Sequence, residues 1–327
     1  MLRRKLVTLA ASALAVPAVI GTLTGKGWAD GSSAGGLGQA LRKFLKLPGK
    51  KSYLLHVGDD PTTGWYAYQP NLLLFTASAF KTFVLAQYLR DVEAGRLLED
   101  QELPIDDSVR TLGSPVFLDL TGTTMARVVL EAMITHSDNT ATDLAMLKAG
   151  VGAVRALIAK AGLRSIRIPD STRIFASYIL GAPAGVDLGW PGILDAAKHP
   201  PGPTRPLLNP VVTLAGTARD FVSWYEQALA GVFFAKPETL VEFKRIQAMS
   251  DQIVKTVPAN TPAWAKGGEV GNFNGSNAKS FAGQMLARGN TPVTFCFIVN
   301  WTSSQNDFPA VEAEFFAAIA RVLIAVG

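Results

Sequence analysis

The sequence predicts an α+β protein in which a discontinuous lobe, built on an antiparallel five-stranded sheet, encloses an inserted helical lobe. Two strand-like segments lie near the N-terminus and three near the C-terminus, whereas helical patterns dominate from about residue 78 to residue 181. Of the 327 residues, 48% are hydrophobic and 17% charged, which suits a globular protein with a full core. Because strands and helices are segregated in this way, we expect the functional site at the seam between the lobes.

The first 29 residues have the layout of a signal peptide. The basic residues Arg3 and Arg4 precede an apolar run from residue 6 to about residue 23, and we expect cleavage after Ala29. This predicts export to the periplasm or the medium, and the arginine pair resembles a twin-arginine signal without its usual preceding serine or threonine. The alternative is an uncleaved membrane anchor, which Pro17 disfavours because it interrupts a run barely long enough to span a bilayer.

Charge, cysteine and histidine counts exclude several classes of function. Much of the formal charge of +5 comes from the basic start of the chain, so little is left for a nucleic-acid footprint. The single cysteine, Cys296, excludes an intramolecular disulfide and lies in an apolar run, which predicts a buried core residue. The 3 histidines lack metal-ligand spacing. We expect no metal, no cofactor and no nucleic acid, and a monomeric protein.

The strand and helix signals can be placed in order along the chain. Apolar residues at helical spacing predict a helix at 37–47, and alternating patterns predict strands at 52–57 and 64–68. Turn residues separate three further strands, expected at 263–270, 278–287 and 292–301, from one another, and a helix at about 310–326 closes the chain. The expected division is a signal peptide at 1–29, a linker at 30–36, a sheet lobe at 37–76 and 211–327, and a helical lobe at 77–210 that includes a Pro-rich surface loop at 182–210.

The first candidate for chemistry is the tetrad Ser78-Ala-Phe-Lys81, which follows a strand-like run at 72–76 and opens an apolar helical segment. A serine in the first helical turn lies where the helix dipole favours developing negative charge, and Lys81 lies one turn later on the same face. A lysine partly removed from water has a lowered pKa and can accept the serine proton. Alone, the tetrad is more typical of a helix cap with a surface lysine.

Two further motifs follow the tetrad. Ser137-Asp-Asn139 comes after an amphipathic segment at 125–135, and Lys266-Gly-Gly268 lies in the first of the C-terminal strands. In order and context, the three motifs match the S-x-x-K, S-D-N and K-T-G set of penicillin-recognising serine enzymes. From about residue 52 to the C-terminus, the sequence resembles the class A β-lactamase-like family.

The resemblance implies a β-lactamase/transpeptidase-like fold, with terminal helices flanking the sheet, and an acyl-serine mechanism. Ser78 would be the nucleophile and Lys81 its base or proton relay. Ser137 would pass the proton to the leaving group, and Lys266 would keep that relay cationic and orient the substrate. The backbone N–H groups of Ser78 and Glu269 would form the oxyanion hole. The residues implied at the substrate site are Gly113, Asn139, Tyr178, Gly267 and Gly268.

The sequence departs from the family at the Ω loop, where an E-x-x-L-N glutamate hydrolyses the acyl-enzyme. The matching segment is 171–181, and the glutamate position falls near Tyr178, with neither the glutamate nor the asparagine present. Deacylation then uses another base, for which Tyr178, Asp170 and Lys81 are the candidates, or it is slow.

Three further substitutions bear on the substrate. The hydroxyl residue of K-T-G, which helps to grip the carboxylate of a β-lactam, is Gly267, and Glu269 follows the triplet in place of a small neutral residue. Both changes disfavour an anionic substrate if Glu269 faces the cleft. Alternation along the strand is the opposing possibility, because it can turn Glu269 away. Gly113 replaces the aromatic residue that precedes S-P-V in the family, which predicts a wider mouth.

We therefore expect a serine hydrolase that cleaves a small-molecule ester or amide, with weak turnover of β-lactams. One alternative is a true class A-type β-lactamase with a displaced deacylating base. The other is a binding protein that recognises penicillin or peptidoglycan-like ligands without turnover.

Overall fold

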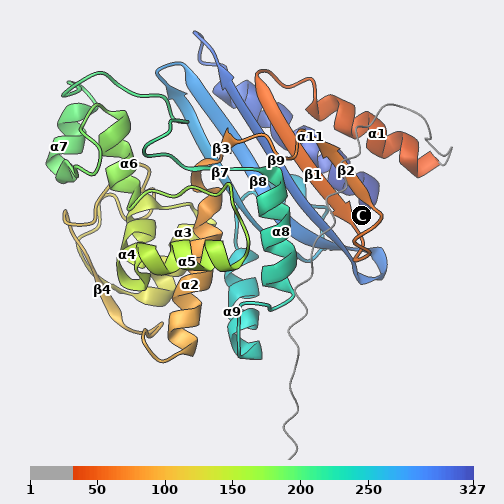
Figure 1. Ribbon diagram of the computed structural model, residues 1–327, viewed down its shortest axis with the longest axis horizontal. Coiled ribbons are helices and arrows are strands. Elements are labelled where there is room, and N and C mark those ends of the chain that lie inside the picture. The colour runs from red at the N-terminus through yellow and green to blue at the C-terminus, as the bar shows by residue number, and fades with distance from the viewer. Residues whose placement is uncertain (1–31) are drawn as a thin grey trace, which may run out of the picture.

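A five-stranded antiparallel sheet forms the centre of the larger lobe (Figure 1). The computed structural model describes residues 32–327, so the expected signal peptide lies outside the described residues. The strand order is β2-β1-β9-β8-β7, which places the strand with the K-G-G motif at one edge. This arrangement confirms the predicted fold class. The strands are β1 (Lys50–Val57), β2 (Trp65–Tyr68), β7 (Ala263–Phe273), β8 (Ser276–Ala287) and β9 (Thr291–Thr302).

Helices cover both faces of this sheet. Helices α1 (Ser32–Phe44) and α11 (Phe308–Val326) lie on one face, where Phe44 packs edge-on against Phe297 at 5.1 Å between ring centroids. Helix α8 (Ala218–Leu229) covers the other face, and it buries Trp224 completely. Cys296 is buried between α8 and the sheet, as its apolar context predicts. Side chains therefore alternate between two cores along β9.

The helical lobe is built around α2 (Lys81–Glu93). Every residue from 81 to 89 is buried, so α2 is surrounded by other elements instead of presenting one apolar stripe. Helix α9 lies beyond residue 211 but packs on α2 and α3, so the two lobes share this stretch of chain. The remaining helices of the described chain are α3 (Ala126–Thr135), α4 (Asn139–Ala149), α5 (Val151–Lys160), α6 (Thr172–Ile179), α7 (Gly189–Ala196), α9 (Pro237–Gln247) and α10 (Ile253–Thr256).

Two short strand pairs complete the described frame, and the segment before Ser78 differs from expectation. The strand expected at 72–76 is reduced to β3 (Leu74–Phe75), which pairs with β6 (Ala215–Gly216). The chain leaves β3 after only two residues because it turns directly into the helical lobe. A second small pair joins β4 (Glu102–Ile105) to β5 (Gly122–Met125).

The Pro-rich segment at 182–210 is not a simple surface loop, which corrects the sequence prediction. It contains α7, whose Ile193 and Ala196 are buried in a small apolar cluster of their own. Its later part is tied to α6, because Arg205 donates hydrogen bonds to the carbonyl oxygens of Tyr178 and Ala182. Apolar residues at helical spacing within 189–196 indicate this helix, but the many prolines nearby led us to predict a loop.

Among residues 32–327, no helix combines the length and apolar character needed to cross a bilayer.

A buried histidine ties the sheet to α8. His56 on β1 is 4% exposed; its Nδ1 lies 2.6 Å from Glu226 Oε1, and its Nε2 lies 3.0 Å from the carbonyl oxygen of Asp60. An ionised carboxylate and a carbonyl oxygen only accept, so both ring nitrogens donate and the ring is the imidazolium. Burial alone lowers the pKa of His56, but the hydrogen bonds to Glu226 and Asp60 outweigh it and raise the pKa above its usual value.

This pair predicts a stability that falls with rising pH. A histidine with a raised folded pKa contributes stability that is complete below about pH 6.5 and is lost as the pH rises through the folded pKa. Glu226→Gln should therefore lower the melting temperature by a few degrees at pH 6 and by less at pH 9. The matched control is Asp195→Asn in the exposed His199–Asp195 pair, which should change neither value. An equal loss at both pH values in Glu226→Gln would contradict an imidazolium at His56.

Candidate active site

Ser78 lies in a single turn of 3₁₀ helix, Ala77–Phe80, at the junction of the two lobes. Ala77 has φ 47°, in the left-handed region that alanine rarely adopts, so the backbone bends sharply just before the serine. The neighbours Ala79 and Phe80 are buried at 1% exposure, which fixes the turn from beneath. Ser78 itself is half-buried, and within the described chain its hydroxyl has no hydrogen-bond partner. The nucleophile proposed from the sequence is thus rigidly held and open to a ligand.

Lys81 brings the first two motifs together. Its ammonium is fully buried and donates hydrogen bonds to the Ser137 carbonyl oxygen, to Ser137 Oγ at 3.3 Å and to Asn139 Oδ1 at 2.7 Å. Asn139 is fixed in turn by a 2.8 Å bond from its Nδ2 to the Leu112 carbonyl oxygen. The S-x-x-K and S-D-N motifs therefore form one hydrogen-bonded unit.

Burial lowers the pKa of Lys81. Desolvation is the largest cause that holds the pKa of Lys81 well below its usual value, and the nearby charge of Lys266 adds to the effect. The carboxylates of Asp138 and Asp143 oppose the shift without cancelling it. A neutral amine is consequently accessible at a lower pH than for a lysine in water, which is what a general base beside a serine needs.

Asp138 shapes the loop that carries Ser137. Its Oδ1 accepts from the Ala141 N–H as the N-cap of α4, and its Oδ2 accepts 2.9 Å bonds from the N–H groups of Val116 and Phe117. Both carboxylate oxygens are used by the backbone, so Asp138 has a positioning role. Ser137 itself has φ 58°, and this constrained conformation turns its carbonyl and hydroxyl oxygens toward Lys81.

Lys266 on β7 is the second buried cation of the site, at 1% exposure. Its Nζ donates a 2.8 Å hydrogen bond to the Gly267 carbonyl oxygen. Desolvation lowers the pKa of Lys266 to about 8, while the charges of Asp251 and Glu269 act in the opposite direction. The charge of Lys266 is one of the causes that lower the pKa of Lys81, so the third motif also reaches the seam.

Gly268 explains why β7 can approach the nucleophile. A Cβ atom built on Gly268 would lie 2.4 Å from the Ser78 backbone nitrogen and 2.5 Å from the Thr76 carbonyl oxygen. Both contacts are with backbone, which cannot move aside cheaply. Glycine is therefore required at this position of the motif, and β7 packs directly against the Ser78 turn.

The Glu269 side chain points away from the Ser78 turn, which is the second of the two orientations that the sequence leaves open. Its carboxylate forms an ion pair with Lys279 on β8, and Lys279 also pairs with Glu312 on α11. Burial opposes ionisation of Glu269, but the charge of Lys279 outweighs it and lowers the pKa. Alternation along β7 places Gly268 toward Ser78 and Glu269 toward α11. Side-chain repulsion from Glu269 therefore does not select the substrate.

Gly113 lies at the mouth of the site, where its carbonyl oxygen accepts from the Asn139 N–H at 3.1 Å. It has φ 74°, and a Cβ there would lie 2.7 Å from Asn139 Nδ2. The glycine is exposed, in keeping with the open mouth that the sequence predicts.

The Ω-like segment is docked next to the site without a glutamate. Asp143 holds the start of α6 by accepting from the N–H groups of Thr172 at 2.6 Å and Arg173 at 3.0 Å, and burial raises the pKa of Asp143 to about 6. Tyr178 is 8% exposed, with the Arg205 guanidinium 4.2 Å from its ring centroid. Asp170 pairs with Arg155 at 2.8 Å on the surface.

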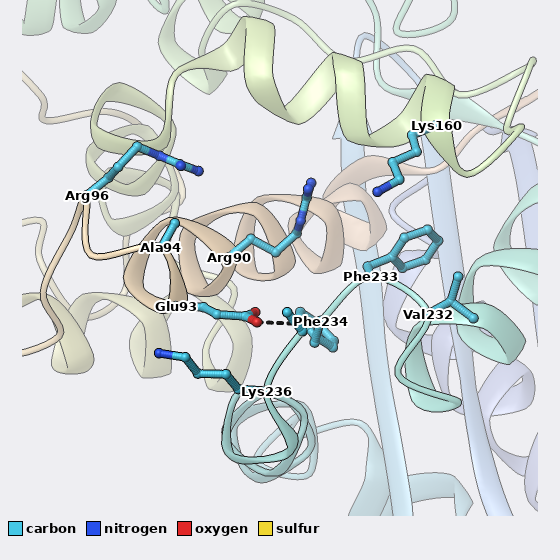
Figure 2. A pocket seen from close by; sticks show the side chains of 10 residues that line it. Arg90, Glu93, Ala94, Arg96, Lys160, Val232, Phe233, Phe234 and Lys236 are labelled. Atoms are coloured by element: carbon cyan, nitrogen blue, oxygen red, sulfur yellow. Dashed lines mark hydrogen bonds between the residues drawn. The ribbon is translucent and has the colours of Figure 1, made fainter. Parts of the chain in front are cut away.

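A separate cavity of about 470 Å³ lies at the opposite end of α2 from Ser78 (Figure 2). Arg90, Lys160 and Lys236 contribute cations to its lining, and Glu93 accepts a hydrogen bond from the Ala235 N–H. It contains none of the residues of the three motifs. Among residues 32–327, no group of histidine, cysteine and carboxylate side chains could hold a metal ion.

Sequence reasoning missed three residues that the structure brings to the site. Asp143 follows Ser137 by six residues, a spacing that places it on α4 within reach of the Ω-like segment and was available as a signal. Asp251 and Gln252 lie in the turn between α9 and α10, which carries no motif, so only the folded chain shows that they lie beside Lys266 and Gly267.

An S-x-x-K serine between an antiparallel sheet and a helical lobe, with S-D-N and K-G-G beside it, defines the class of penicillin-recognising serine enzymes. The chain belongs to the beta-lactamase enzyme family, whose family model matches residues 37–275. No curated protein matches its sequence.

Solved structures share the fold at low sequence identity. A beta-lactamase from Chitinophaga pinensis has a TM-score of 0.68 at 17% identity, covering 89% of this chain and 97% of that one. An ancestral class A beta-lactamase has a TM-score of 0.66 at 18% identity, covering 89% and 98%. A mutant of PBP-A, solved as an acyl-enzyme complex with penicillin G, has a TM-score of 0.66 at 15% identity, covering 89% and 96%.

The close packing of β7 on the Ser78 turn gives a test of the geometry. Gly268→Ala should slow acylation of Ser78 by at least tenfold, because the added methyl group forces β7 away from the Ser78 backbone nitrogen. Stopped-flow acylation by an aryl ester measures the effect, and thermal unfolding reports the fold. Gly152→Ala on α5 is the control, since no atom lies within 4 Å of its Cβ position. Unchanged acylation in Gly268→Ala would show that this close packing of β7 on the Ser78 turn is not needed for acylation.

Proposed function

We propose that this chain is a serine hydrolase that cleaves a small-molecule ester or amide through an acyl-Ser78 intermediate. The observation that supports it most is the buried Lys81 ammonium, bound to Ser137 and Asn139 one helical turn from an unpaired serine hydroxyl. A structural lysine would pair with a carboxylate. Lys81 instead binds neutral oxygen atoms, which leaves it free to lose its proton.

The proposed acylation step uses the motif residues in turn. Ser78 Oγ attacks the substrate carbonyl and Lys81, in its neutral form, accepts the serine proton. The proton then passes through Ser137 Oγ, which lies 3.3 Å from Lys81 Nζ, to the leaving oxygen or nitrogen as the carbonyl reforms. The N–H groups of Ser78 and Glu269 stabilise the negative carbonyl oxygen, a contribution of about 3 kcal/mol for each donor.

Deacylation must proceed without the Ω-loop glutamate. Asp170 is engaged by Arg155 on the surface, and the ring of Tyr178 is covered by Arg205. We therefore infer that Lys81 also activates the hydrolytic water. A single base shared by two steps predicts a slow second step, so a penicillin acyl-enzyme should be long-lived.

A penicillin-binding protein without turnover is the second candidate function. It is favoured by the same missing glutamate, and a mutant of PBP-A, similar in fold, has been solved as its acyl-enzyme with penicillin G. The two candidates differ in whether an acyl-Ser78 ester is released within the lifetime of an assay. Export is a further part of the proposal, and its support is the basic and apolar N-terminal pattern.

The nucleophile and its base can be tested separately. Ser78→Ala should abolish burst and steady-state release of p-nitrophenol from a neutral aryl ester. Lys81→Met should slow acylation by a factor of roughly a hundred, as expected for removal of a general base. Full activity in Ser78→Ala would contradict the proposed function.

The pH dependence of acylation tests the electrostatics. Because burial and Lys266 hold the pKa of Lys81 well below its usual value, the rate should rise with pH and level off well below the pKa of about 10.4 of a lysine in water. Lys266→Met removes a positive charge that disfavours protonation of Lys81, so the inflection should move to higher pH even if the rate falls. The control Lys236→Met, at the distant cavity, should leave the inflection of the pH profile unchanged. An inflection unchanged by Lys266→Met would contradict the coupling between the two lysines.

A further inference from the structure

The space that a K-T-G hydroxyl would take is filled by another residue. A Cβ atom built on Gly267 would lie 1.8 Å from Gln252 Oε1, 2.3 Å from its Cδ and 2.5 Å from its Nε2. The carboxamide of Gln252 thus lies directly against the strand position where the family carries its carboxylate-gripping hydroxyl. Gly267 lacks the hydroxyl side chain of K-T-G, and the side chain of Gln252 occupies the space that this side chain would need.

The backbone around Gln252 places it between the second and third motifs. The Asp251 N–H donates to the carbonyl oxygen of Thr135, two residues before Ser137, at 3.4 Å. The Gln252 carbonyl oxygen accepts from Thr256 Oγ1 at 2.8 Å. The main chain is therefore anchored on both sides, while the side chain reaches toward β7 next to Lys266.

Several polar atoms near this point lack partners. Within the described chain, Gln252 Oε1, Ser250 Oγ and Thr135 Oγ1 are buried and make no hydrogen bond. Gln252 is 5% exposed and Ser250 is 2% exposed. Buried polar groups are almost always paired, so three unpaired oxygen atoms on segments joined by the Asp251–Thr135 hydrogen bond indicate that a bound group supplies the partners.

We propose that Gln252 is a specificity-determining residue that selects substrates with a neutral, N–H-bearing group at the position where a β-lactam has its carboxylate. This inference rests on the proposed function and names its substrate class. The unpaired Gln252 Oε1 accepts a hydrogen bond from an amide N–H. A carboxylate has no hydrogen to donate to this oxygen.

The surrounding charges affect how strongly the site favours a carboxamide over a carboxylate. Lys266 would attract a carboxylate, but the carboxylate of Asp251 acts on Lys266 and offsets part of its charge. Close opposite charges leave only a weak net field for a third charge at this point. The hydrogen bond to Gln252 is then the largest difference between an amide and an acid, and one such bond is worth about tenfold in binding or rate.

The test uses two esters with the same acyl group, whose alcohol portions differ only in ending as a carboxamide or as a carboxylate. Wild-type protein should favour the carboxamide ester in kcat/KM by about tenfold. Gln252→Met keeps the volume and removes the hydrogen bond, so it should reduce that preference to near unity. Gln305→Met, an exposed glutamine near the C-terminal helix, is the matched control and should preserve the preference. Thermal unfolding of each variant confirms that the fold is retained.

A second pair of variants tests the shared space. Gly267→Thr alone should gain nothing with the carboxylate ester, because Gln252 occupies the position of the new side chain. Gly267→Thr combined with Gln252→Ala should raise its acylation rate, since the restored hydroxyl can then donate to the carboxylate. Equal rates in the single and double variants would overturn the inference, as would a carboxylate preference in the wild type.

Binding to the Ser78→Ala variant separates this inference from the proposed function. Calorimetry with the two esters reads the Gln252 contact without any acylation step. Tighter binding of the carboxamide ester that is lost in Ser78→Ala/Gln252→Met supports the inference even if Ser78 is never acylated. Equal binding of both esters overturns it even if the protein proves to be an active hydrolase.

Discussion

The burial of one positive charge organises the candidate site. A fully desolvated ammonium at Lys81 costs free energy unless hydrogen bonds replace its water, and the Ser137 and Asn139 oxygens supply them. Those oxygens stay in place because Asp138 fixes the loop through three backbone N–H groups. The same burial that must be compensated lowers the pKa of Lys81 and so makes it a base. Stability and chemistry therefore depend on the same contacts.

The fold and the motif residues could be predicted from the sequence because they are local signals. Strand-like patterns and turn residues predicted the five strands, and the three motifs identified Lys81, Ser137 and Lys266, which the structure brings to one seam. The helix at 189–196 was missed, since proline and glycine nearby obscured its apolar spacing. Gln252 was missed for a different reason: its role arises from a tertiary contact with Gly267, and nothing in the local sequence encodes it.

Glu269, which follows the K-G-G triplet, shows that a residue beside a motif need not face the active site. Glu269 has the charge to repel an anionic substrate, but the pleat turns it toward Lys279 and α11. We propose that Gln252, which lies at the start of α10 instead of on the strand, controls the charge of the substrate. This chain has glycine at the position of the K-T-G hydroxyl and no glutamate at the expected Ω-loop position, while the S-x-x-K and S-D-N motifs are present.

The central claim is that Ser78 forms a covalent acyl-enzyme that is released slowly when the acyl group is a penicillin. The most direct measurement is intact-protein mass spectrometry over time after mixing with penicillin G or with a neutral aryl ester, followed by peptide mapping. The account predicts one adduct on Ser78 with each compound, and a penicillin adduct that outlasts the ester adduct. An adduct on another residue, no adduct with either compound, or a penicillin adduct that clears as fast as the ester adduct would contradict it.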